Sequence, residues 1–162
     1  MPYSSPLPVI YFIATIAIAM ILRVMSLWPE LDPYNPDWIA LALIYWSMAL
    51  PERFGVFSAW TVGLLTDVLT GRLLGQYALI YALVVYFSIK EHRRLRQFPM
   101  LQQCVFVMLC LLGSHSIIFG TQSMQAGNRF TLEFWYPVVT GTLMWPLVFA
   151  ALRYIRVLAR IE

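Results

Sequence analysis

Long runs of apolar residues, separated by short polar connections, extend over almost the whole chain. Runs of about 17–25 apolar residues are long enough to cross a bilayer as helices. The pattern therefore predicts an all-α, polytopic membrane protein with about six transmembrane helices. The second run is the shortest, and we expect it to draw on its flanks or to lie in a thinned bilayer. The six runs are Pro8–Trp28, Trp38–Leu50, Phe54–Thr70, Leu73–Ile89, Pro99–Phe119 and Leu132–Leu152.

Two of the connections carry information about the helices beside them. The second run is preceded by Asn35, a favoured N-cap residue, by Pro36 at the first helical position and by Asp37 in the first turn. The third and fourth runs are separated only by Gly71 and Arg72. Two geometries are open there: a tight helical hairpin, or a broken helix that dips back. The hairpin is favoured, because each arm alone nearly spans a bilayer.

The composition supports a chain with almost no soluble part. The 162 residues are 60% hydrophobic and 12% charged, whereas soluble domains are about 25% charged. We therefore expect residues 1–162 to form a single transmembrane domain, with the first run retained as a helix. The net charge of +3 comes without a basic stripe on a soluble surface, which argues against nucleic acid as a partner. Cys104 and Cys110 lie on different faces of one predicted helix, so we expect buried free thiols.

The basic residues predict the orientation of the chain. With the N-terminus in the cytoplasm, eight of the eleven Lys and Arg residues face the cytoplasm, which is a positive-inside pattern. We therefore expect a multi-pass protein of a bacterial inner membrane with both termini cytoplasmic. The basic loop after the fourth run is a topology determinant, and anionic lipid head groups are its candidate ligands. The eight residues are Arg53, then Lys90, Arg93, Arg94 and Arg96 in this loop, then Arg153, Arg156 and Arg160 in a C-terminal tail.

Small residues and one acid recur at intervals of four around the third run. Gly63, Asp67, Gly71 and Gly75 are spaced to lie on one helix face. Small residues let helices approach closely, and a carboxylate at membrane depth is costly unless it is paired. This stripe therefore predicts a helix-packing face that meets the first helix or a partner protein. Arg23 lies at a depth similar to that of Asp67, so the two are candidates for an intramembrane ion pair. The alternative is that each side chain reaches separately to the outer interface.

The chain offers little for catalysis. His115, between two serines in the fifth run, is typical of an interhelical hydrogen bond, and no second His, Cys or carboxylate stands at metal-ligand spacing. Motifs of hydrolases, phosphate loops and dinucleotide-binding folds are absent from the sequence. We expect no enzyme activity, no cofactor and no metal. Charged residues near the predicted outer face are few: Arg23, Asp67, Arg72 and Glu133.

Several motifs resemble the MreD family of rod-shape-determining membrane proteins. The resemblance rests on the helix start Pro36-Asp37-Trp38, the turn from Ala49 to Arg53, the glycine and aspartate stripe, and Leu143-Met144-Trp145-Pro146 in the last run. It covers nearly the whole chain and departs mainly in the first helix.

The resemblance implies a non-enzymatic role in bacterial cell-wall elongation. MreD proteins partner the single-span protein MreC, in a complex with the actin-like MreB, the glycosyltransferase RodA and its transpeptidase. The implied fold is a six-helix bundle similar to the substrate-binding subunits of energy-coupling-factor transporters. Membrane lipids and a second copy of the chain are further candidate partners. The favoured function is a membrane scaffold that binds another protein's helix, and the alternative is a small-molecule-binding subunit of a transporter.

Overall fold

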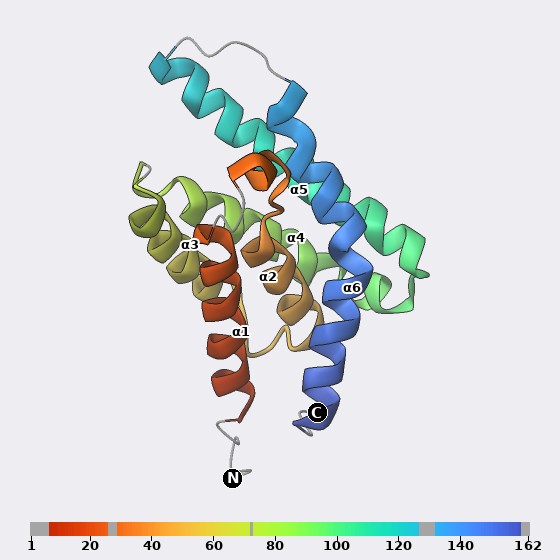
Figure 1. Cartoon of the computed structure of the whole chain (residues 1–162). Helices are drawn as coiled ribbons and strands as arrows, with labels where there is room; N and C mark the ends of the chain where they lie inside the picture. The colour runs from red at the N-terminus through yellow and green to blue at the C-terminus, as the bar shows by residue number, and fades with distance from the viewer. Residues whose placement is uncertain (1–6, 26–28, 72, 127–131, 160–162) are drawn as a thin grey trace.

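The computed structural model of the chain describes residues 7–25, 29–71, 73–126 and 132–159, and in these residues it is all-helical (Figure 1). This confirms the predicted all-α fold with six helices. Two short 3-10 helices, Pro29–Tyr34 and Leu132–Trp135, precede the second and sixth helices. The six helices are α1 Leu7–Val24, α2 Trp38–Ala49, α3 Val56–Thr70, α4 Gln76–Gln97, α5 Met100–Ala126 and α6 Tyr136–Leu158.

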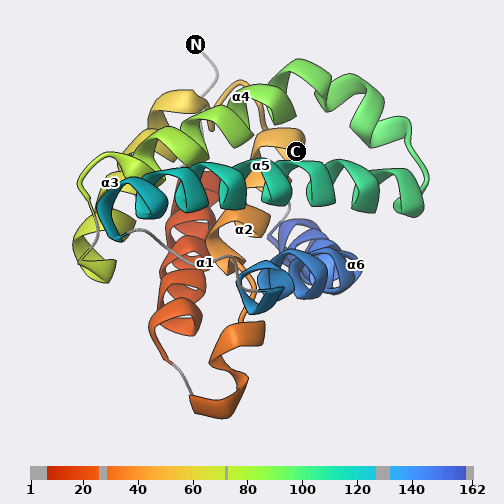
Figure 2. The same cartoon turned by 90° about the horizontal axis from the view of Figure 1, so that it is seen from above.

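Helix α2 lies at the centre of the molecule, between α1 and α6 (Figures 1 and 2). Eleven of its twelve residues are buried, as expected for a helix that is apolar all round. At about 1.5 Å per residue it is roughly 18 Å long, which is shorter than the hydrocarbon core of a bilayer. Because α1, α4, α5 and α6 all contact α2, these neighbours shield it from lipid.

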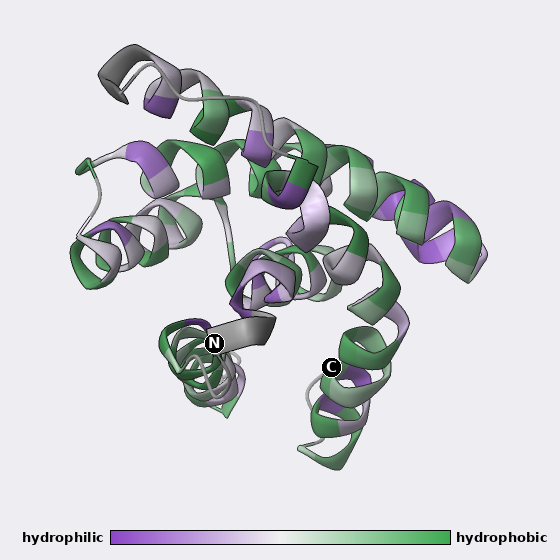
Figure 3. Cartoon of the chain, turned by 45° about the horizontal axis from the view of Figure 1, so that its top comes forward, coloured by the Kyte–Doolittle hydropathy of each residue, from purple (hydrophilic) through white to green (hydrophobic). Residues whose placement is uncertain are grey.

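Three helical segments are long and apolar enough to cross a membrane: Leu7–Val24, Met100–Ser123 and Leu132–Leu158. Large apolar side chains cover their outer surfaces, including Ile13, Leu101 and Leu143, which are 60%, 81% and 70% exposed. Figure 3 shows hydrophobic residues along most of each helix. Exposed apolar surface on this scale indicates contact with lipid, consistent with a polytopic membrane protein.

Helices α3 and α4 form a helical hairpin, the geometry favoured from the sequence, and pack along each other. Helix α3 ends at Gly71, whose φ of 61° is left-handed, and α4 begins after Gly75, whose φ is 99°. Glycine adopts such backbone angles without the steric cost of a Cβ atom.

Several helix ends differ from the prediction. Helix α4 continues to Gln97, so the predicted basic loop is its last turns, and α6 continues to Leu158, so the predicted tail residues Arg153 and Arg156 are helical. Long polar side chains continue a helix readily once it has started, so hydropathy marks the membrane boundary and not the helix end. The N-cap of α2 is Asp37 and not Asn35, whose side chain instead accepts a hydrogen bond from the indole of Trp38.

Candidate functional site

A buried ion pair joins α1 to the start of α2. Nη1 of Arg23 lies 2.8 Å from Oδ1 of Asp37. The same carboxylate caps α2, because it accepts a hydrogen bond from the backbone N–H of Ala40 at 3.2 Å. The hydroxyl of Tyr81 on α4 donates to Asp37 at 2.9 Å. One acid therefore ties three helices together.

Helix α4 holds the arginine as well. Arg23 donates hydrogen bonds to the hydroxyls of Tyr77 and Tyr81, and its guanidinium lies 4.5 Å from the centre of the Tyr77 ring. The two tyrosines are four residues apart on one face of α4. A guanidinium over an aromatic face gains a cation–π interaction that strengthens as water is removed.

The predicted ion pair between Arg23 and Asp67 is wrong. Asp67, on α3, is fully buried and accepts hydrogen bonds from the backbone N–H groups of Gly75, Tyr77 and Ala78, at 2.8, 2.8 and 3.3 Å. These donors belong to the start of α4. The first N–H groups of a helix lack partners within the helix, and its positive end favours a carboxylate. The start of α4 therefore satisfies Asp67 without an arginine.

The four residues of the glycine and aspartate stripe do not share one helix face. Gly63 and Asp67 are buried on α3, and a Cβ atom added at Gly63 would fall 2.5 Å from the backbone nitrogen of Ala78. Gly71 and Gly75 lie in the turn, with open space around both. The close approach at Gly63 is therefore to α4 of the same chain. The full burial of Asp67 also excludes it from contact with a partner protein.

A pocket of about 510 Å³ opens at the N-terminal end of α2, and we call it the N-end pocket. Arg23, Asp37, Tyr77, His115 and Glu133 line it, together with residues of α3, α5 and α6. Of these, Arg23, His115 and Glu133 are candidates from the sequence, whereas Asp37 is expected only to begin a helix and Tyr77 is not among the expected site residues. The sequence does carry a signal for both: an acid at the start of the second run, and tyrosines four apart in the fourth run.

The interhelical hydrogen bond expected of His115 stays a prediction. Its Nδ1 lies 3.0 Å from the carbonyl oxygen of Leu111 in the same helix, and its ring packs edge-on against Phe134. Over the described ranges, no three His, Cys, Asp or Glu side chains gather as a metal site. Cys104 and Cys110 are both free thiols, as expected, but they are half-buried and not buried. Arg72 lies outside the described residues.

The basic residues after the fourth run separate into two groups. Lys90, Arg93 and Arg94 are exposed on α4, and Arg94 makes a surface ion pair of 3.5 Å with Glu91. Arg96 instead turns toward the C-terminal end of α2, where it donates to two backbone carbonyl oxygens. One residue of the basic stretch, Arg96, therefore joins the end of α4 to the end of α2.

Comparison with known proteins identifies the family. The sequence model for the rod shape-determining protein MreD matches residues 4–155. The chain is similar to the rod shape-determining protein MreD of Haemophilus influenzae (strain ATCC 51907 / DSM 11121 / KW20 / Rd), with 28% identity over 144 residues that cover 86% of each chain. No solved structure matches the chain. Because the family match extends over nearly the whole sequence, the chain belongs to the MreD family of rod shape-determining proteins.

Proposed function

We propose that this protein is a non-enzymatic inner-membrane scaffold of the cell-wall elongation machinery, and that it binds a single-span protein of the MreC type. The machinery in question includes MreB, RodA and its transpeptidase. Membership of a rod shape-determining family supports the role in cell shape.

The partners of the two buried acids favour a scaffold over a protein that transports protons or substrates. Asp37 binds Arg23, Tyr81 and the start of α2, and Asp67 binds the start of α4. Proton relays need acids that change partners, whereas each of these carboxylates is held by groups of neighbouring helices. The apolar outer faces of the bundle are then free to pack against lipid or against a partner's helix.

Purification of the tagged full chain from its native membrane tests the scaffold. We expect a single-span membrane protein to be recovered with it, and not with an unrelated polytopic protein purified in the same way. Recovery of the chain without such a protein, from cells whose rod shape is intact, would refute the proposal.

We further propose that both termini and the end of α4 face the cytoplasm. The charge asymmetry supports this, and the start of α1 and the end of α6 lie at the same end of the molecule (Figure 1). Reporter fusions at Arg96 and at Glu162 should be active only as cytoplasmic reporters. A fusion at Leu132 should be active only as a periplasmic reporter. A periplasmic signal at Arg96 or Glu162 would contradict the orientation.

The N-end pocket favours a second candidate function, a small-molecule-binding subunit. Its volume of about 510 Å³ lies within the range of small-molecule sites, and both charges and aromatic rings line it. The expected likeness to substrate-binding subunits of energy-coupling-factor transporters agrees with this. Mass spectrometry of the purified protein distinguishes the two functions. A metabolite released from the wild type, and absent from a His115→Ala variant, would favour the transporter subunit.

A further inference from the structure

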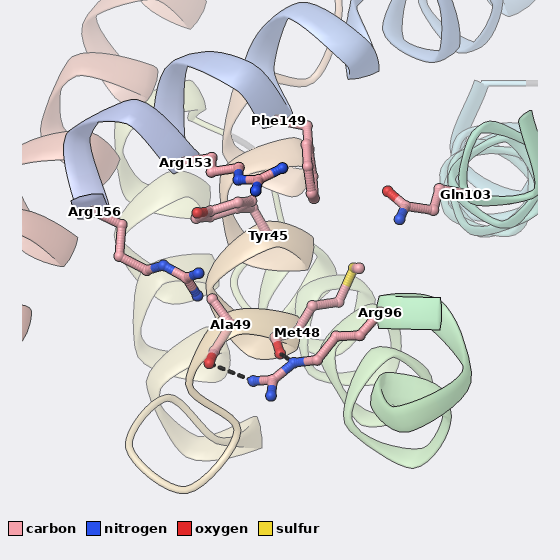
Figure 4. A pocket seen from close by; sticks show the side chains of 8 residues that line it. All are labelled: Tyr45, Met48, Ala49, Arg96, Gln103, Phe149, Arg153 and Arg156. Atoms are coloured by element: carbon pink, nitrogen blue, oxygen red, sulfur yellow. Dashed lines mark hydrogen bonds between the residues drawn. The ribbon is translucent and has the colours of Figure 1, made fainter. Parts of the chain in front are cut away.

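A second pocket lies at the opposite end of α2, and we call it the C-end pocket. It has a volume of about 290 Å³ and lies among the last turns of α2, the end of α4, the first turns of α5 and the last turns of α6 (Figure 4). Three arginines line it: Arg96, Arg153 and Arg156. None of the residues that line this pocket is an acid, and the buried carboxylates of Asp37 and Asp67 lie elsewhere, at the start of α2 and beside the start of α4.

One of the three arginines forms the wall of the pocket. Arg96 donates through Nε to the carbonyl oxygen of Met48, at 2.8 Å, and through Nη2 to that of Ala49. These carbonyls belong to the last turn of α2, where the helix leaves acceptors without partners and its dipole is negative. Arg96 is therefore fixed at the rim, and two of its five N–H donors are occupied.

The other two arginines have no such partner. Arg153 and Arg156 are three residues apart on α6, so they share a helix face, and Figure 4 shows both side chains directed into the pocket. Among the described residues, neither makes an ion pair or a hydrogen bond through its guanidinium. Two like charges on one face repel each other, and a bound anion would remove that repulsion.

Tyr45 supplies an independent observation at the same place. The residue is 3% exposed, and its hydroxyl is buried without a hydrogen-bond partner among the described groups. Figure 4 shows the hydroxyl between the guanidinium groups of Arg153 and Arg156. A buried polar group without a partner is costly, and in native proteins it indicates an unassigned water, ion or ligand.

The chemistry of these groups defines the ligand. Arginine side chains only donate hydrogen bonds, and a hydroxyl facing two cations donates its proton outward. The ligand that suits these three side chains is therefore an acceptor with negative charge and several oxygens. Guanidinium groups match phosphate geometry well. Apolar contacts from Met48 and Phe149 complete the wall.

We propose that the C-end pocket binds a phosphate group through Arg153, Arg156 and the hydroxyl of Tyr45. Two sources present this chemistry at a membrane surface: the head group of an anionic phospholipid and free phosphate. Basic pockets between the ends of membrane helices are typical sites for anionic head groups.

Binding to the purified full chain in a neutral detergent tests the proposal with two probes. The first probe is dioleoylphosphatidylglycerol in mixed micelles, with dioleoylphosphatidylcholine as its uncharged counterpart. The second is inorganic phosphate. Saturation by the lipid alone assigns the phosphate to a lipid head group, and saturation by inorganic phosphate, with competition against the lipid, assigns it to a free anion. Either result supports the site.

Two double variants distinguish binding in this pocket from attraction to positive charge on the protein surface. We expect the Arg153→Gln/Arg156→Gln double variant to raise Kd at least about tenfold, since each removes a charge-assisted bond. Arg93→Gln/Arg94→Gln removes the same charge from the exposed surface of α4 and should leave Kd within about twofold. Equal losses in the two double variants, or no binding of either probe to the wild type, would overturn the proposal.

Tyr45→Phe keeps the proposal testable if the arginine variants fail to fold. Without a ligand, this variant should be at least as stable as the wild type, because it removes a buried hydroxyl that has no partner. With the saturating probe, it should bind several-fold more weakly. A loss of stability without any ligand, at unchanged affinity, would instead assign the hydroxyl a structural role and would count against the site.

Discussion

Replacement of Asp67 by alanine should destabilise the protein strongly, because it removes the acceptor for the first turn of α4. The carboxylate accepts hydrogen bonds from three backbone N–H groups, with N···O distances of 2.8, 2.8 and 3.3 Å. Side-chain hydrogen bonds in membrane proteins contribute about 0.6–1.7 kcal/mol each, and bonds to charged groups about 1.5–3 kcal/mol. Two strong bonds and one weak bond give a loss of about 3 kcal/mol in the free energy of unfolding, or roughly a hundredfold in the unfolding equilibrium constant.

Reversible unfolding of the detergent-solubilised protein in an SDS titration, followed by tryptophan fluorescence, measures this loss. Asp67→Asn should fall between the wild type and Asp67→Ala. The amide keeps one acceptor oxygen but directs an NH₂ group at the other N–H donors. Glu52→Gln is the matched control, because Glu52 is exposed, and it should change stability by less than about 0.5 kcal/mol.

The reasoning fails if Asp67→Ala is as stable as Glu52→Gln. Such a result would mean that water, or another group, satisfies the start of α4 when the carboxylate is absent.

Two further predictions concern the same region. Gly63→Ala should cost about 1–3 kcal/mol, because the added methyl group meets the backbone of α4, whereas Gly113→Ala, where the added atom meets open space, should cost nothing in the same titration. Equal effects would contradict the close approach of the two helices. In a double-mutant cycle, Arg23→Ala and Asp37→Ala should be coupled, with the double variant losing less than the sum of the single losses. Arg23→Ala and Asp67→Ala share only Tyr77 as a partner, so their coupling should be smaller than that of Arg23→Ala and Asp37→Ala, and a larger coupling would favour the pair that the structure does not show.

The sequence was sufficient for the fold class, and it marked Arg23 as a candidate for an ion pair, but it named the wrong acid. Depth along a helix placed Arg23 in the last turn of α1, where the structure has it. It could not choose between Asp67 and Asp37, because that choice depends on how α1 and α2 pack. Asp37 was read for its local effect on α2 alone. For a carboxylate that caps one helix and pairs with another, only the capping role can be recognised from the sequence.

The four-residue spacing fails for a different physical reason. A shared face for all four residues requires one helix through Gly71, but glycine also ends helices in the left-handed conformation. Both roles suit the same residue, so spacing alone cannot separate them. Arg96 shows a further limit. Its carbonyl partners belong to residues 48 and 49, far back along the chain. Local sequence patterns do not predict contacts between residues so far apart.

The short central helix explains how a chain with so few charges forms two polar pockets. Helix α2 ends in the N-end pocket on one side and in the C-end pocket on the other. Asp37 stands at its positive end and Arg96 at its negative end, which is the arrangement that the helix dipole favours. Helix α2 is only about 18 Å long, so its two charged ends are closer together than those of a full transmembrane helix would be. A ligand in either pocket therefore meets a charged side chain that also holds α2 in place, and its binding would stabilise the centre of the bundle.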